Sequence, residues 1–307
     1  MTTLKDTLIA VLMGGPGSER EVSLASGKAV LEVLQASGLN AVGVDVTNHQ
    51  PELPEGCGLV FNTIHGTFGE DGELQRYLEE RGIPCTGADS TASHIAFDKL
   101  ISKQAFVEAE VPTPASEVIH RDSLPCLPKM GLPCVIKPPC EGSSVGVHIA
   151  HTEQEAADAL ADAAKFGEEI LVESFVSGKE LTVGILNDQA LPVVHIAPRS
   201  GFYDMANKYP WMTGDGGTDY YCPADLSPAA TKRVQDAALA AQRALNIDSY
   251  SRVDVLLDAD ENPWVLEINT IPGMTSSSLL PKAAAEAGFD FAQLCQIIAQ
   301  QALDKAK

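Results

Sequence analysis

Four polar side chains that could do chemistry lie close together in the stretch SRVDVLLDADENPWVLEIN. Two apolar arms flank the polar residues DADEN, a pattern that predicts an antiparallel hairpin with its loop at 259–262. In that register Asp254 faces Glu267 and Arg252 faces Asn269. Residues two apart share one face of a strand, so all four side chains are expected to point to the same side.

The composition of this group suggests a metal site. Two carboxylates side by side on an otherwise apolar hairpin repel each other unless a cation lies between them. Asp254, Glu267 and Asn269 offer oxygen ligands, which suit a hard ion such as Mg²⁺ bound together with phosphates. A solvated hairpin face is the alternative, but it explains neither Arg252 beside the carboxylates nor the run IPGMTSSS that follows Asn269.

A second stretch that could do chemistry is EGSSVG at 141–146, which follows a predicted strand ending near Lys137. Such a loop can fold over phosphates, with backbone N–H groups and hydroxyls on the oxygens and a lysine supplying positive charge. It is not a Walker loop, because no G-K-[ST] follows, and GGPG at 14–17 does not match G-x-G-x-x-G. Taken alone, each loop is better explained by an ordinary tight turn.

The elements that must position these groups begin with an α/β alternation, which predicts a small parallel sheet with crossover helices. Gly38 is the expected stop of the first helix. The expected elements are a strand at 7–13, a helix at about 18–37, strands at 40–46 and 58–64, and a helix at 72–82.

A further helix is expected at about 91–109, where VPTP ends it because proline cannot continue the backbone ladder. The first hinge is placed there. Strands PCVIKP, VHIA and EILVESFV with a helix at 152–165 make up the middle of the chain. The last third contains strands KELTVGIL and LPVVHIA, a polar segment at 199–221, a helix at 228–245, the hairpin and two terminal helices.

Bulk properties exclude several classes of protein. The chain has 307 residues, of which 45% are hydrophobic and 21% charged, as in a globular enzyme with two or three subdomains. A formal charge of −21 disfavours binding to nucleic acid or to an anionic membrane surface. The apolar run TLIAVLM is too short to span a bilayer, so a cytoplasmic location is expected. Seven scattered cysteines without C-x-x-C spacing favour reduced thiols.

Several motifs together resemble one known family. GGPGSEREVSLASG, HGTFGEDG, DKLISK, VIKPPCEGSSVG, SRVDVLLD and LEINTIPGMTSSSLLP occur in this order and at this spacing in the D-alanine:D-alanine ligases of the ATP-grasp superfamily. The resemblance covers nearly the whole chain. It implies an α/β fold with α+β character in the C-terminal two-thirds, in which a Rossmann-like part at 1–98 precedes two ATP-grasp parts at 99–184 and 185–307.

The resemblance also implies the reaction and its cofactors. ATP phosphorylates the carboxylate of one D-alanine, and the amine of a second D-alanine attacks the D-alanyl phosphate to give D-alanyl-D-alanine for peptidoglycan precursors. Two Mg²⁺ ions, with Mn²⁺ as a possible substitute, would be held by Asp254, Glu267 and Asn269. A homodimer is expected, with D-alanine and ATP as its small-molecule substrates.

Residue roles follow from matching each motif position. Lys99 and Lys137 would hold the α- and β-phosphates, Glu173 and the backbone of Phe175 and Val176 would meet the adenine, and Glu180 would bind the ribose hydroxyls. The remaining roles concern the amino acids: Glu19 on the first ammonium and His65 near its carboxylate, Arg252 and the Gly273 N–H on the oxyanion, Ser278 and the Leu279 N–H on the second carboxylate, Ser143 and Tyr209 in a hydrogen-bonded set with Glu19, and Lys208 with Tyr209 in a closing loop.

Other functions stay open at this point. A ligase that joins D-alanine to D-lactate or D-serine has the same fold, although the pair Lys208-Tyr209 favours an amine nucleophile. A nucleotide-binding regulator without turnover is a second alternative, but the carboxylates and Arg252 that catalysis needs are present. A nicotinamide dehydrogenase is the third alternative, suggested only by the N-terminal alternation, and it lacks the glycine fingerprint.

Overall fold

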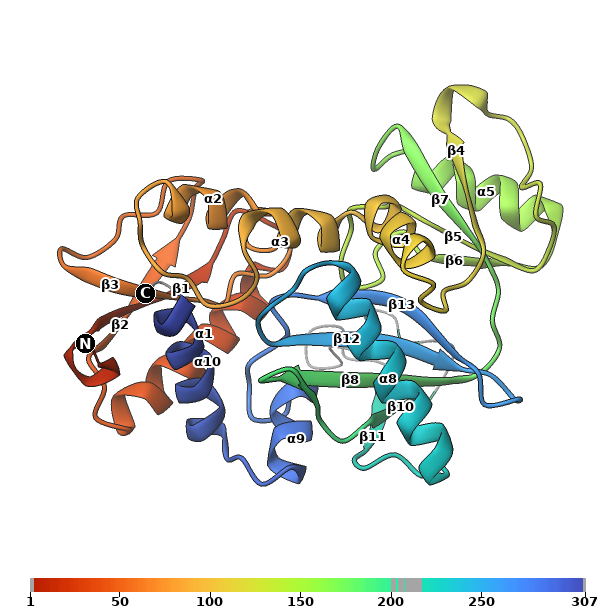
Figure 1. The fold of residues 1–307 in the computed structure, drawn as a ribbon. Coiled ribbons are helices and arrows are strands. Elements are labelled where there is room, and N and C mark those ends of the chain that lie inside the picture. The colour runs from red at the N-terminus through yellow and green to blue at the C-terminus, as the bar shows by residue number, and fades with distance from the viewer. Residues whose placement is uncertain (1–2, 200–202, 204–206, 208–216, 306–307) are drawn as a thin grey trace.

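The computed structural model describes residues 3–199, 203, 207 and 217–305. In this part of the chain three sheets follow one another across the molecule (Figure 1). A three-stranded sheet lies at the N-terminal end, a four-stranded sheet at the opposite end, and a six-stranded sheet between them.

The first sheet confirms the predicted small parallel sheet. Its strand order is β2-β1-β3 with all pairs parallel. Side chains alternate across it: Ile9 and Val11 pack in one apolar cluster with α1 and α10, whereas Ala10 and Leu12 pack in another with α2. The elements are η1 (Leu4–Asp6), β1 (Leu8–Gly14), α1 (Arg20–Ala36), β2 (Ala41–Val46), β3 (Cys57–Asn62), α2 (Glu73–Glu79) and α10 (Phe291–Lys305).

The helix expected at 91–109 is two helices, α3 (Ser90–Phe97) and α4 (Lys99–Glu108). The prediction of one helix was wrong because Asp98 between them has extended backbone and its carboxylate accepts hydrogen bonds from the N–H groups of Leu100 and Ile101. An aspartate in this role caps a new helix. The break places Lys99 in the first turn of α4, and that helix ends at Glu108, before the segment VPTP.

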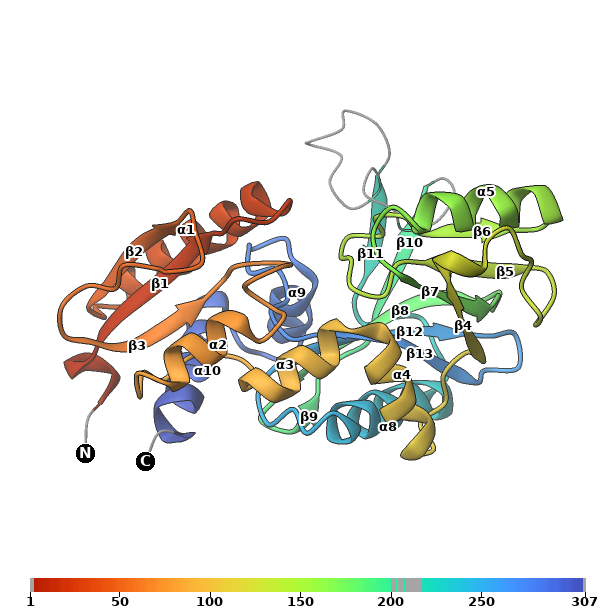
Figure 2. The same ribbon diagram turned by 90° about the horizontal axis from the view of Figure 1, so that it is seen from above.

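The four-stranded sheet has the order β4-β7-β5-β6 with antiparallel pairs. One face packs on α5, as Figure 2 shows, and contributes Ile136 and Val172 to a shared apolar cluster. The next residues along these strands, Lys137 and Glu173, point to the other face, which lines a cavity. The elements are β4 (Ser116–His120), η2 (Arg121–Ser123), β5 (Cys134–Lys137), β6 (His148–Ala150), α5 (Glu153–Ala163) and β7 (Glu169–Ser174).

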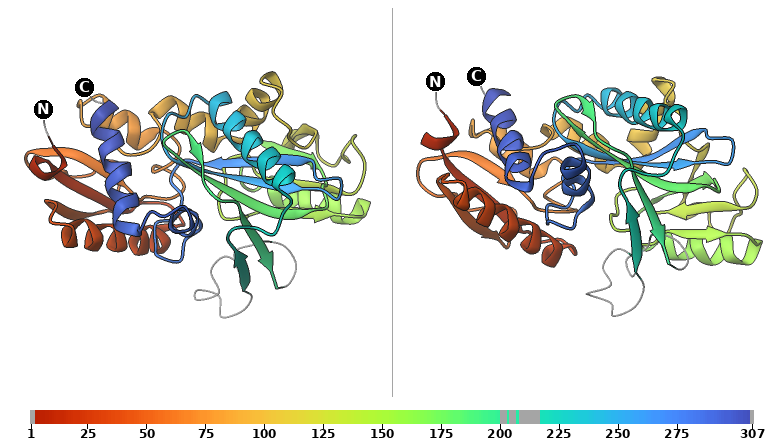
Figure 3. Two further views of the ribbon diagram at one scale, coloured as in Figure 1. Left: turned by 60° about the horizontal axis from the view of Figure 1, so that its bottom comes forward. Right: turned by 90° about the horizontal axis from the view of Figure 1, so that it is seen from below.

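The six-stranded sheet has the order β11-β10-β8-β12-β13, with β9 paired to β8. Helix α8 covers one face with small residues such as Ala238 and Ala241, which allow close packing against Val253 and Val255. Strands β10 and β11 extend away from the rest of this sheet (Figure 3). The elements are β8 (Lys179–Leu186), β9 (Gln189–Ala190), β10 (Val194–Pro198), β11 (Thr218–Tyr221), α8 (Pro228–Ala244), β12 (Ser251–Leu257), β13 (Pro263–Asn269) and α9 (Leu279–Glu286).

Of the two expected subdomain boundaries, one falls between elements of this fold and the other falls inside a strand. The one between 98 and 99 falls between α3 and α4, whereas the one between 184 and 185 lies inside β8. The division into three subdomains stays a prediction. Among the helices that the structure describes, none is both long and apolar enough to cross a membrane.

Candidate active site

The hairpin of β12 and β13 has the predicted register at its inner end. Arg252 pairs with Asn269, and Asp254 pairs with Glu267. Nearer the turn the register differs from the prediction, since Val255 pairs with Val265. The extra residue is a β-bulge in β13, which the apolar pattern of the arms does not reveal. As a result the consecutive residues 266 and 267 both line the cavity.

Asp254 is the buried centre of this hairpin site. The guanidinium of Arg252 donates to both carboxylate oxygens, from Nε to Oδ1 at 3.0 Å and from Nη2 to Oδ2 at 2.9 Å. The hydroxyl of Thr182 donates to Oδ1 at 2.6 Å, and the amide of Asn269 donates to Oδ2 at 3.3 Å. Burial lowers the pKa of Arg252, but the Asp254 carboxylate outweighs burial and raises it, so the guanidinium stays charged.

Glu267, the second carboxylate, contacts a different cation. Its Oε2 lies 3.3 Å from the ammonium nitrogen of Lys99. The same ammonium donates to the backbone carbonyl of Glu141 at 2.8 Å. Lys99 therefore connects the hairpin to the Gly/Ser loop.

A cavity of about 500 Å³ lies between the four-stranded sheet and the hairpin. All the residues that the sequence assigns to nucleotide binding line it, together with both carboxylates of the hairpin and Ser143. The predicted nucleotide residues on its wall are Lys99, Lys137, Glu173, Phe175, Val176 and Glu180.

Glu173 lies inside this wall between two lysines, one of which the sequence reasoning missed. Its Oε2 is 2.7 Å from Lys137 Nζ, and its Oε1 is 2.6 Å from Lys103 Nζ. Lys103 also donates to the hydroxyl of Thr113 at 2.7 Å. Burial raises the pKa of Glu173, but the two ammonium groups outweigh burial and lower it. The signal for Lys103 was the DKLISK spacing, since residues four apart share a helix face with Lys99.

The Gly/Ser loop has a strained backbone. Ser143 and Ser144 have φ angles of 51° and 60°, in the left-handed region, where each such residue costs on the order of 1–3 kcal/mol. The hydroxyl of Ser143 donates to the carboxylate of Glu19, and the hydroxyl of Ser144 donates to the backbone carbonyl of Tyr203 at 2.9 Å. The loop thus connects the cavity to the start of α1.

Glu19 sits between two glycines that leave no room for a side chain. A Cβ on Gly66 or on Gly142 would lie 2.8 Å from Glu19 Oε2. Gly66 also has a φ of +69°, which favours glycine. The predicted contact between Glu19 and Ser143 is present in the structure.

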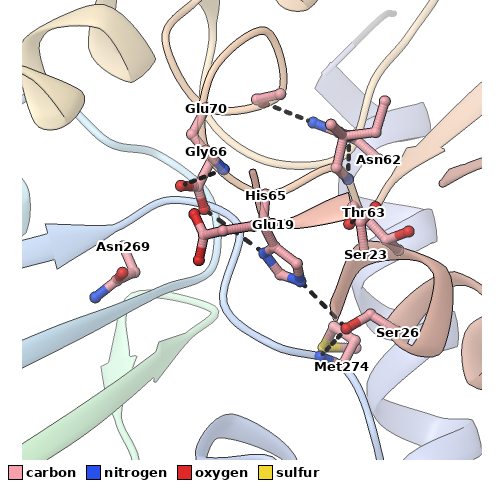
Figure 4. A network of polar contacts seen from close by, with 12 residues as sticks. Glu19, Ser23, Ser26, Asn62, Thr63, His65, Gly66, Glu70, Asn269 and Met274 are labelled. Carbon is pink, nitrogen blue, oxygen red and sulfur yellow. Dashed lines mark hydrogen bonds and ion pairs between the residues drawn. The ribbon is translucent and has the colours of Figure 1, made fainter. Parts of the chain in front are cut away.

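His65 lies in a buried polar network between α1 and the segment that follows β13 (Figure 4). Its Nδ1 is 3.9 Å from Oε1 of Glu70, and its Nε2 is 3.2 Å from the hydroxyl of Ser26. That hydroxyl accepts a hydrogen bond from Met274 N–H at 3.2 Å. Burial lowers the pKa of His65, but Glu70 and, more weakly, Glu19 outweigh it and raise the pKa.

Gly273, Ser278 and Leu279 come together at the start of α9. Helix α9 begins at Leu279 with Ser278 as its N-cap, as the sequence predicts. The Ser278 hydroxyl accepts from the N–H of Thr275 at 3.1 Å, and a Cβ on Gly273 would lie 3.0 Å from it. Lys208 and Tyr209, the predicted residues of the closing loop, lie outside the described residues.

Comparison with known proteins identifies the family. Residues 108–300 match the sequence model described as the D-ala D-ala ligase C-terminus. The chain belongs to the D-alanine–D-alanine ligase family. A ligase of this name from Methylacidiphilum infernorum (isolate V4) is 46% identical over 291 residues, covering 94% of this chain and 93% of the relative. One from Bordetella petrii is 42% identical, covering 97% and 92%.

Solved structures of D-alanine–D-alanine ligases share the ATP-grasp fold of this chain. The enzyme from Bacillus anthracis complexed with ATP has a TM-score of 0.83 at 30% identity and covers 98% of both chains. The VanG D-Ala:D-Ser ligase from Enterococcus faecalis has the same TM-score at 27% identity, covering 96% of this chain and 99% of its own. The fold alone therefore does not separate ligases that differ in the second substrate.

The residues of this D-alanine–D-alanine ligase family member fit a divalent cation by their donor chemistry. Asp254 and Glu267 face each other beside the cavity, and Asn269 adds an amide oxygen to the same strand face. Each carboxylate contacts a cationic side chain of the protein, which shows that positive charge is favoured here. Within the described ranges no three His, Cys, Asp or Glu side chains are arranged to hold a metal ion.

Proposed function

We propose that this chain joins two D-alanines into D-alanyl-D-alanine at the expense of ATP. The observation that carries the proposal is the cavity whose wall holds the predicted nucleotide residues next to Asp254 and Glu267. Relatives named D-alanine–D-alanine ligase, 40–46% identical over at least 94% of the chain, support the same reaction. Synthesis of peptidoglycan precursors in the cytoplasm by a homodimer belongs to this proposal.

The cavity would bind ATP with its phosphates toward the hairpin. Lys99 and Lys137 both line the cavity, and Lys99 contacts Glu267 of the hairpin, so their ammonium groups would act as point charges for phosphate oxygens. Glu173, Phe175 and Val176 would meet the adenine and Glu180 the ribose, since all four also line the cavity. The Bacillus anthracis structure complexed with ATP supports nucleotide binding by this fold.

Asp254, Glu267 and Asn269 would hold two Mg²⁺ ions, or Mn²⁺, against the phosphates. When bound, such ions neutralise the charge that develops during phosphoryl transfer. Lys99, which contacts Glu267, is also placed to turn its ammonium group toward a phosphate. Arg252 keeps the Asp254 carboxylate in one orientation through its two hydrogen bonds.

The two amino acids would bind beside the hairpin, between α1 and α9. Glu19 would accept hydrogen bonds from the first ammonium, with His65 near the first carboxylate. The N-terminus of α9 at Ser278 and Leu279 would bind the second carboxylate, since exposed N–H groups there attract anions. Arg252 and the N–H of Gly273 would stabilise the oxyanion of the tetrahedral intermediate that forms when the second amine attacks the acyl phosphate. This intermediate collapses to the amide as the nitrogen loses a proton and phosphate leaves.

A ligase that accepts D-serine or D-lactate is the second candidate, favoured by the equal TM-score of the VanG D-Ala:D-Ser ligase. The two candidates share ATP, the metal ions and the first D-alanine. They differ only in the second substrate, so product analysis separates them.

The test is ADP and phosphate release from ATP and Mg²⁺ with D-alanine alone, and with D-alanine plus D-serine or D-lactate, followed by mass spectrometry. We expect one ADP per D-alanyl-D-alanine formed, with the dipeptide dominating every mixture. ATP consumption without a dipeptide or ester would contradict ligase activity, and a dominant mixed product would identify the second candidate. Gel filtration with light scattering tests the homodimer.

A further inference from the structure

Ser26 lies at a junction of three segments that are far apart in the sequence. It is fully buried in the middle of α1. Its hydroxyl contacts the Nε2 atom of His65 and the N–H group of Met274, each at 3.2 Å (Figure 4). His65 follows β3, and Met274 belongs to the segment at 270–278 that joins the hairpin to α9. One hydroxyl therefore connects the two sides of the proposed amino-acid site.

We propose that Ser26 is a positioning residue that holds the Gly273–Met274 peptide in place relative to the ring of His65. This inference rests on the proposed function, since it assigns Gly273 and His65 to the site of the reaction. Ser26 itself lies behind both residues, within the protein. It acts through them.

The hydrogen-bonding capacity of a hydroxyl explains why serine suits this position. A hydroxyl has one hydrogen to donate and two lone pairs that accept. One lone pair of Ser26 accepts from Met274 N–H. The hydrogen can then go to a neutral His65 Nε2, or the second lone pair can accept from a protonated Nε2. Met274 N–H keeps its acceptor in both cases.

The surroundings of His65 make both protonation states relevant. The carboxylate of Glu70 faces the ring from the segment after β3, and that of Glu19 faces it from the start of α1. The backbone of Ile271 also contacts the ring. The adjacent Gly66 N–H donates to Oε2 of Glu70 at 3.1 Å. A ligand carboxylate near the ring would change this balance of charge, and Ser26 can adapt to the change without releasing the Met274 peptide.

The Met274 hydrogen bond restrains the backbone at the point where it matters for the oxyanion. Gly273 has no Cβ, so its torsions are less restricted than those of other residues. A peptide plane held on one side of Gly273 limits the directions in which the Gly273 N–H can point. The side chain of Met274 is also buried, which anchors the same residue from its other end.

Ser23 offers a matched control one turn earlier in the same helix. It is equally buried, and its hydroxyl accepts from Gly14 N–H at 2.9 Å and donates to the carbonyl of Thr63 at 2.8 Å. Both partners belong to the first sheet or its edge, away from the segment at 270–278. Loss of this hydroxyl removes two buried hydrogen bonds, neither of which involves His65 or Met274.

The experiment compares Ser26→Ala with Ser23→Ala. We expect both variants to lower the urea midpoint of unfolding by similar amounts. For Ser26→Ala we expect kcat/KM for D-alanine to fall at least tenfold with KM for ATP unchanged, because the cavity residues are not affected. For Ser23→Ala we expect both kinetic constants to stay within twofold of wild type. Equal losses in the two variants would overturn the proposal.

A second measurement does not depend on turnover. Hydrogen exchange followed by NMR should show the Met274 amide protected in wild type and in Ser23→Ala, and exchanging at least tenfold faster in Ser26→Ala. An unchanged Met274 amide in Ser26→Ala would overturn the role of Ser26 even if activity fell. Should wild type form no dipeptide, the proposed reaction fails, and the exchange rates still decide whether Ser26 holds the peptide.

A conservative variant serves if Ser26→Ala does not fold. Ser26→Cys keeps a weak acceptor and a weak donor at the same position. We expect Met274 exchange and kcat/KM between those of wild type and the level predicted for Ser26→Ala. NMR also shows whether the His65 ring still contacts the side chain of Cys in Ser26→Cys. If that contact is lost while Met274 exchange and kcat/KM equal those of wild type, the requirement for a hydroxyl is contradicted.

Discussion

The carboxylate of Glu173 contacts the ammonium group of Lys103 at 2.6 Å, and both side chains are almost completely buried. Lys137 lies on the other carboxylate oxygen. Glu173 and Lys137 line the cavity, whereas Lys103 does not, and burial lowers the pKa of Lys103. The cluster thus joins the interior of the protein to the wall of the proposed nucleotide site.

Lys103→Met should lower the free energy of unfolding by about 3 kcal/mol, because one cation is lost from a buried ion cluster. Urea denaturation followed by circular dichroism measures this change. Lys165→Met is the control, since Lys165 forms an exposed pair with Asp162 and should matter little. Adding Glu173→Gln to Lys103→Met leaves Lys137 without its counter-charge, so the double variant should be less stable than Lys103→Met. Equal stability of the two would contradict the buried pair of Lys137 with Glu173.

Stability should fall in acid partly through Glu173. The pKa of this carboxyl is lower in the folded protein than its ordinary value of 4.5, so its ionised form contributes stability that is fully present above pH 4.5. The contribution is lost as the pH falls through the lowered folded value. The difference in unfolding free energy between wild type and Glu173→Gln should therefore shrink as the pH falls below 4.5 and through the lowered folded value. A difference that is constant over this range would mean that Glu173 does not titrate this way.

Glu267→Gln and Asp254→Asn should separate catalysis from stability. Glu267 is partly exposed, so its loss should change the unfolding free energy by less than about 1 kcal/mol. Asp254→Asn leaves the buried guanidinium of Arg252 without its counter-charge, which should cost about 3 kcal/mol. Both variants should lower kcat at least about 100-fold, since each removes a proposed ligand charge. Glu267→Gln with activity within tenfold of wild type would remove Glu267 from the proposed metal site.

Gly142→Ala should disturb the first amino acid more than the fold. The new Cβ would lie 2.8 Å from Glu19 Oε2 and push the carboxylate aside. We expect KM for D-alanine at the first site to rise at least tenfold with ATP binding little changed. Gly167→Ala is the matched control, because a Cβ there meets only one atom, at the ordinary distance of 4.0 Å. Equal KM values for the two variants would show that Glu19 is not held by Gly142.

The hairpin shows what the sequence could predict and why. Strand side chains alternate with a period of two, so the facing pairs of Arg252 with Asn269 and Asp254 with Glu267 followed from two apolar arms and a polar loop. The bulge beyond Asp254 did not follow, because one extra residue leaves the apolar pattern of both arms almost unchanged. The break at Asp98 was also missed, although an aspartate is a common helix cap.

The contacts between distant segments were beyond sequence patterns. Ser26 and Met274 touch although 248 positions separate them, and nothing in the local sequence of either residue indicates the other. Lys103 was missed for a different reason: it lies in α4, whereas its partner Glu173 lies in β7, and a lysine on a helix is usually solvated. Sequence motifs indicated the residues that would touch ligands. The residues that hold those side chains in place are determined by packing between distant segments.

The position of α10 has a consequence for how this protein is made. Its apolar residues Leu294 and Ile298 complete the cluster that covers Ile9 and Val11 of β1. Most of the chain must leave the ribosome before that helix exists, and synthesis proceeds at roughly 5–20 residues per second. One face of the first sheet is therefore expected to be only partly covered, by α1, for roughly 15–60 s during translation. This delay makes the nascent chain a substrate for chaperones, and α10 is the helix that completes the cluster.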